Sequence, residues 1–189
     1  MSSLQWAAAI PLAIFTVSAV SRLRFLGVTA AGACIALFGG LMAAYDESVS
    51  ASILWVLSHP AVARDFTLVQ ALHYLSLAFG GVGFSVPFGL LMAGICIPAA
   101  FMKLLPRWVI VLGLALAVVG ELSWLNMPIQ HRVLGFLIPL TRFPGFIWII
   151  AAGFKLPKTA THPYRRLRRA LPLRWPSLGP LRCGPSVLG

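Results

Sequence analysis

The sequence predicts an all-α protein, a polytopic bundle of five transmembrane helices. Of its 189 residues, 59% are hydrophobic and only 10% are charged, whereas soluble domains carry about 25% charged residues. Its apolar runs approach or exceed the roughly 20 residues that a helix needs to cross ~30 Å of hydrocarbon. A bilayer admits only helices or closed barrels, and these runs lack the alternating period of barrel strands. They therefore predict membrane helices.

Five apolar segments account for the expected spans. The first is short and contains Pro11, and if it lies in the membrane interface, four spans remain. The third lies within an apolar run too long for one straight crossing. We expect it to bend near Pro87, because proline removes a backbone donor and clashes with the preceding turn. In chain order the predicted spans are residues 4–20, 25–45, 72–97, 108–125 and 133–154.

The connections between the spans predict the orientation, because Lys and Arg are retained on the cytoplasmic side. Basic residues follow the first, third and fifth spans. In contrast, residues 46–65 hold three acids and one arginine, and residues 126–132 hold one arginine. We therefore expect a multi-pass protein of the cytoplasmic membrane with its N-terminus outside and its C-terminus in the cytoplasm.

The chain divides into the helical bundle, residues 1–157, and a basic tail, residues 158–189. More than half of the 15 basic residues lie from Lys155 onward, among six prolines, so we expect the tail to be disordered. Clustered arginines just inside a membrane attract anionic lipid by roughly 1 kcal/mol per residue. Alternatively, they only reinforce the orientation. The long apolar runs favour a lipid bilayer over nucleic acid as the partner of this basic chain.

Three sequence blocks lie in and between the third and fifth spans. They are LHYLSLAFGGVGFSVPFGLLMAG at 72–94, LLPRW at 104–108 and TRFPGFIWIIAAGFKLP at 141–157. Together they resemble the C-terminal half of a family of small bacterial integral membrane proteins of unknown function. The resemblance implies a helical bundle in a bacterial inner membrane, and it assigns no activity. Members often carry a helix before the segment that corresponds to 4–20, and we expect that N-terminal helix to be missing here.

Arg142 lies between Pro139 and Pro144, about ten residues from the outer end of the fifth span, which is ~15 Å deep. An arginine at this depth costs at least ~2.5–3.5 kcal/mol on insertion scales. It therefore requires a partner, a wet cavity or a break in the helix. The two prolines favour such a break, which would expose carbonyl oxygens to the guanidinium.

Two further polar residues fall in the outer half of the bundle: Glu121 at ~6 Å depth and His73 at ~10 Å. We expect Glu121 to be the counter-ion of Arg142, since a lone buried charge is costly, and His73 to complete the cluster. Three interpretations remain open. The pair only orients two helices, or the cluster binds a polar ligand or relays a proton. In the third, Arg142 simply snorkels to the membrane interface or the span lies elsewhere.

Small residues recur every four positions in the third span, at Gly81, Ser85, Gly89 and Ala93. Such a stripe predicts close helix packing, within the chain or between copies in a homo-oligomer. A phosphate-binding loop is not indicated, because the glycine run follows no strand and has no nearby Lys-Ser/Thr.

No arrangement of residues indicates a metal, a cofactor or an enzyme. No two histidines share a helical face, the three cysteines lack metal-binding spacing, and no nucleophile stands beside a base. The first hypothesis is a structural or accessory membrane component. The alternative is a small-molecule binding or transport module with a polar pocket around His73, Glu121 and Arg142.

Overall fold

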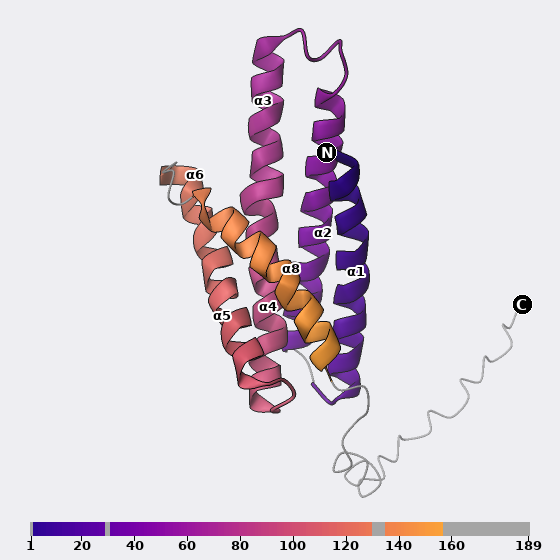
Figure 1. Ribbon diagram of the computed structural model, residues 1–189, viewed down its shortest axis with the longest axis vertical. Helices are drawn as coiled ribbons and strands as arrows, with labels where there is room; N and C mark the ends of the chain where they lie inside the picture. Colours follow the sequence, from indigo (N-terminus) through magenta and orange to yellow (C-terminus); the bar gives the residue numbers. More distant parts are fainter. Residues whose placement is uncertain (1, 29–30, 130–134, 157–189) are drawn as a thin grey trace, which may run out of the picture. The chain divides into compact units, whose positions relative to one another are not determined.

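The computed structural model describes residues 2–28, 31–129 and 135–156, with side chains from residue 5 onward, and these residues form helices and short connections (Figure 1). No strand occurs among the described residues, so the all-α prediction is confirmed. The described residues form five long helices when α3, η1 and α4 are counted as one continuous helix and α5, η2 and α6 as another, so the predicted number of helices in the bundle is also confirmed. The elements are α1 (Ser2–Phe25), α2 (Ala31–Leu57), α3 (Phe66–Leu77), η1 (Ala78–Gly83), α4 (Phe84–Phe101), α5 (Arg107–Leu122), η2 (Ser123–Leu125), α6 (Asn126–Ile129) and α8 (Leu137–Lys155).

Four helical stretches are long and apolar enough to cross a membrane: Gln5–Phe25, Phe66–Phe101, Arg107–Ile129 and Leu137–Lys155. The chain is therefore a multi-pass membrane protein. The remaining long helix, α2, is not among the four, and it carries Asp46 and Glu47. It begins six residues later than the predicted second span and continues to Leu57 instead of ending at Tyr45.

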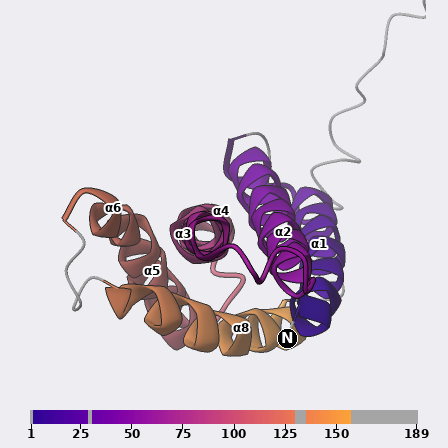
Figure 2. The same cartoon turned by 90° about the horizontal axis from the view of Figure 1, so that it is seen from above.

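The described helices belong to one compact unit, Met1–Lys158. Seen along the bundle, α5, α4, α2 and α1 follow one another, and α8 runs across one face from α5 toward α1 (Figure 2). Aromatic rings pack between α4 and α8. The ring centroids of Phe84 and Phe88 are 4.9 Å apart, and those of Phe88 and Phe146 of α8 are 5.7 Å apart. The first residues of the predicted fifth span, 133–134, and the tail, with its expected disorder and lipid contacts, lie outside the described residues.

The long third helix, Phe66–Phe101, is interrupted by a π-helical turn close to Pro87, where the sequence predicts a bend. This turn, η1, ends four residues before Pro87. Pro87 has no N–H to donate to the carbonyl of Gly83, and its ring crowds that carbonyl, so the irregularity falls on the preceding turn. π-helical turns of this kind occur mostly as single insertions in α-helices, frequently at functional sites.

The small-residue stripe predicted in the third span packs within the chain. A Cβ atom at Gly89 would lie 2.9 Å from the carbonyl oxygen of Ala117 in α5, and one at Gly81 would lie 3.2 Å from Ile138 in α8. Ser85 is fully buried against α5, where a Cβ at Gly120 would lie 2.7 Å from the Ser85 carbonyl oxygen. Ala93 is half-buried against the core.

A second close contact, between α2 and α4, was not anticipated from the sequence. A Cβ atom at Gly94 would lie 2.6 Å from the backbone nitrogen of Ala36, and one at Gly39 would lie 2.7 Å from that of Leu91. The two backbones are therefore nearly in contact. This packing brings the carboxylates of α2 against the beginning of α4, where the polar site forms.

Candidate functional site

Arg142 of α8 is bound by groups from α2, η1 and α4, and we call these residues together the Arg142 site. Its Nη2 donates to Oε1 of Glu47 in α2, which forms an ion pair. Its Nη1 donates to the carbonyl oxygen of Gly80 in η1 at 3.1 Å. Its Cζ lies 4.9 Å from the ring centroid of Phe84 at the start of α4, a distance at which a cation is attracted to the ring face.

The counter-ion of Arg142 is Glu47, so the expected pairing with Glu121 was wrong. On α8, Thr141 faces α5, because a Cβ at Gly120 would lie 3.3 Å from the Thr141 methyl group. The next residue points about 100° further around a helix, which turns Arg142 away from α5 and toward α2. Glu121 instead lies beside Gly89, and its Oε1 is buried with no hydrogen-bond partner among the described residues.

Sequence reasoning missed Glu47 because it ended the second span at Tyr45 and assigned Asp46 and Glu47 to a loop. In the structure both acids lie inside α2 and are buried, with Glu47 only 1% exposed. One signal was available: the segment SILWVL follows the acids at 52–57, and it continues the apolar pattern that a longer helix would require.

The π-helical turn presents a carbonyl to Arg142 and is itself held by a pair of serines. Ser50 lies one turn after Glu47 on α2, and its Oγ is 3.1 Å from both the carbonyl oxygen and the Oγ of Ser76 in α3. A Cβ at Gly80 would collide with the Ser50 side chain. Glycine is therefore required at position 80 for η1 to approach α2 and reach the guanidinium.

A cavity of about 400 Å³ adjoins the Arg142 site between α1, α2, α3 and α8. The side chain of Arg142 is 22% exposed and lines this cavity, as does His73, the third member of the predicted cluster. The structure therefore brings His73 and Arg142 to one cavity and leaves Glu121 outside it. The other polar side chains that line the cavity are Gln5, Ser50 and Ser76.

Two buried carboxyl groups, those of Glu47 and Asp46, lie around the π-helical turn that contacts the Arg142 guanidinium. Glu47 uses one oxygen for Arg142, and its Oε2 is buried with no hydrogen-bond partner among the described residues. Asp46, only 6% exposed, lies beside η1, where a Cβ at Gly83 would be 3.5 Å from its Oδ2. The described residues contain no group of three His, Cys, Asp or Glu side chains that could hold a metal ion.

Comparison with known proteins finds no matching family, no matching curated protein and no matching solved structure. The resemblance to small bacterial membrane proteins therefore stays a prediction.

Proposed function

We propose that this chain is a non-enzymatic, structural or accessory component of the cytoplasmic membrane, in which the Arg142 site fastens α8 to the rest of the bundle. The observation that carries the proposal is the engagement of one guanidinium by three other segments, through Glu47, Gly80 and Phe84. An arginine of this kind costs several kcal/mol in a membrane unless protein groups satisfy it, and here they do.

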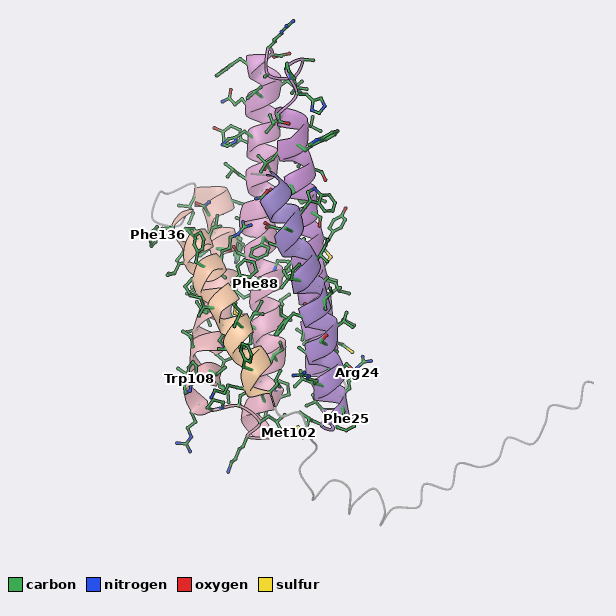
Figure 3. All side chains as sticks on the ribbon, turned by 45° about the vertical axis from the view of Figure 1, so that its right-hand side comes forward. Arg24, Phe25, Phe88, Met102, Trp108 and Phe136 are labelled. Atoms are coloured by element: carbon green, nitrogen blue, oxygen red, sulfur yellow. The ribbon has the colours of Figure 1, made fainter. Side chains whose placement is uncertain are left out.

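The proposed orientation is supported by the distribution of basic residues. Arg24, Phe25, Met102 and Trp108 lie at one end of the bundle, and Phe136 lies toward the other (Figure 3). Lys103 lies in the connection between α4 and α5, and Arg107 is the first residue of α5, so both are at the first of these ends. Because Lys and Arg are retained in the cytoplasm, we assign this end to the cytoplasm and the N-terminus to the outside.

The accessory role is tested with a variant that removes both charges of the ion pair, Glu47→Gln with Arg142→Met. Replacement of a buried pair by groups of similar volume is often neutral for stability, so this variant should reach the membrane in wild-type amount. In a strain in which the gene is deleted, it should restore growth across a panel of conditions as well as the wild type does. Failure to complement at equal protein level would contradict the accessory role and favour a binding site.

A small-molecule binding or transport module is the second candidate, and the cavity beside Arg142 is the observation that favours it. Arg142 has N–H groups beyond the two that it donates to Glu47 and Gly80, and part of its side chain is exposed in the cavity that His73 also lines. Because Glu47 already balances its charge, the cavity suits a neutral polar molecule with hydrogen-bond acceptors better than a strong anion.

Cysteine labelling tests whether this cavity opens to the outer solution. With Cys34, Cys96 and Cys183 changed to alanine, Arg142→Cys should react with a membrane-impermeant thiol reagent added outside intact cells. The control is Thr141→Cys, because Thr141 is 0% exposed and packs against α5, so it should stay unlabelled. Equal lack of labelling at both positions would contradict an open pocket and leave only the packed bundle.

A further inference from the structure

A long apolar groove lies between α1 and α8, on the opposite side of α8 from its contact with α5. It consists of two neighbouring cavities of about 730 and 410 Å³, both lined by Pro11, Phe15 and Arg22 of α1 and by Gly153 of α8. We call it the α1–α8 groove. It is independent of the Arg142 site and of the functions proposed above.

Small residues make this groove hollow. Ala8 and Pro11 line it from α1, and Gly153 lines it from α8. A Cβ at Gly153 would meet the ring of Phe15 at 3.4 Å, which is an ordinary contact, so a Cβ fits at this position without displacing the ring. From Ala8 to Arg22, fourteen residues of helix extend about 21 Å. This exceeds the ~15 Å that one leaflet contributes to the hydrocarbon core, so the groove is long enough for an acyl chain.

Arg22 gives the groove a charged end. Its side chain is exposed and lines both cavities. The chain has four acidic side chains, all of them described, and none is within ion-pair distance of Arg22: Glu47 pairs with Arg142, and Asp65 caps α3 through the backbone N–H groups of Thr67 and Leu68. No acidic side chain of the chain therefore neutralises Arg22.

We propose that the α1–α8 groove binds an anionic phospholipid, with an acyl chain along α1 and the phosphate at Arg22. A guanidinium presents several donors in a planar fork that matches phosphate oxygens. Arg22 lies on the last turn of α1, next to Arg24 at the end of the bundle where the basic connections gather (Figure 3). A headgroup at that level and a chain in the groove fit one lipid molecule.

The test measures lipid binding to the purified full-length protein in non-ionic detergent by native mass spectrometry. Phosphatidylglycerol and phosphatidylcholine of equal chain length are titrated separately. The wild type should prefer phosphatidylglycerol, and Arg22→Gln should weaken its binding about tenfold or more, the factor for loss of a hydrogen bond between charged groups. Arg24→Gln is the matched control, because Arg24 lies outside the groove and contacts Cys34. The basic tail is common to all variants, so its contribution cancels.

A second pair of variants tests the acyl-chain part of the proposal. Gly153→Leu and Ala8→Leu fill the groove from opposite sides while Arg22 is kept, and each should lower the binding of both lipids. Melting temperatures in detergent verify folding, and the variant that folds decides the outcome. Equal loss in Arg22→Gln and Arg24→Gln would indicate diffuse surface charge and overturn the site. Unchanged binding in the groove-filling variants, or competition by soluble glycerol phosphate as strong as by the lipid, would also overturn it.

Discussion

Changing Glu47 to glutamine, with Arg142 retained, is expected to destabilise the bundle by about 3 kcal/mol. Loss of one partner from a buried ion pair costs about 3–5 kcal/mol because it leaves an uncompensated charge. We expect the lower end of this range, since the Arg142 side chain is 22% exposed in its cavity whereas Glu47 is 1% exposed. Denaturant unfolding in detergent micelles, followed by circular dichroism, measures the loss.

The double variant Glu47→Gln with Arg142→Met should be more stable than Glu47→Gln alone. Methionine removes the charge that the first change leaves unpaired, and its apolar side chain still occupies the space of the arginine stem. The wild type, the two single variants Glu47→Gln and Arg142→Met, and the double variant form a double-mutant cycle. If the two single losses add to the double loss within about 0.5 kcal/mol, the two side chains are not coupled, and the ion pair contributes nothing.

A second double-mutant cycle, with Glu121→Gln and Arg142→Met, tests whether Glu121 is the counter-ion of Arg142, as the sequence suggests, or Glu47, as the structure shows. Glu121 lies beside Gly89 on the α5 side of α4 and forms no ion pair with Arg142. The effects of Glu121→Gln and Arg142→Met should therefore add within about 0.5 kcal/mol. A coupling as large as that of Glu47 would restore Glu121 as the counter-ion.

The need of Arg142 for a partner could be read from the sequence, but the identity of that partner could not. The sequence alone shows a charged residue inside an apolar run, and the free-energy cost of placing that charge in a bilayer follows without knowledge of the fold. The choice between Glu47 and Glu121 depends on the rotation of α8, where Thr141 faces α5 and Arg142 points toward α2. A difference of one residue, about 100° around a helix, decides which acid is in reach.

The ends of the helices were harder to predict than their existence. Apolar length identifies a helix, but charged residues that interrupt an apolar run resemble the beginning of a loop. Asp46 and Glu47 suggest such a loop, although they lie in the middle of α2, which continues to Leu57. The π-helical turn could not be predicted either, because the glycines at 80, 81 and 83 also fit a regular α-helix with small-residue packing.

The contact between α2 and α4 leads to the second large expected effect: Gly94→Ala should lower the stability of the bundle. Alanine is the better helix former by about 1 kcal/mol, so local propensity alone predicts the opposite sign. However, the added Cβ would lie 2.6 Å from the backbone nitrogen of Ala36 and 2.8 Å from the carbonyl oxygen of Gly32. Backbone atoms cannot rotate away as a side chain can, so the two helices must separate, and overpacking of this kind typically costs about 1–3 kcal/mol.

Gly153→Ala is the matched control for this prediction. It is the same substitution inside a helix, but its Cβ would meet only the Phe15 ring, at 3.4 Å, so thermal unfolding in detergent should show an unchanged or raised melting temperature. Gly94→Ala should melt at a lower temperature than the wild type. Equal melting temperatures for the two variants would mean that α2 and α4 are further apart than described. Separation of these helices would also move Glu47 of α2 relative to Gly80, because Gly80 lies in η1, which is continuous with α4. Gly94→Ala should therefore reduce the coupling between Glu47 and Arg142 as well, which the same double-mutant cycle measures.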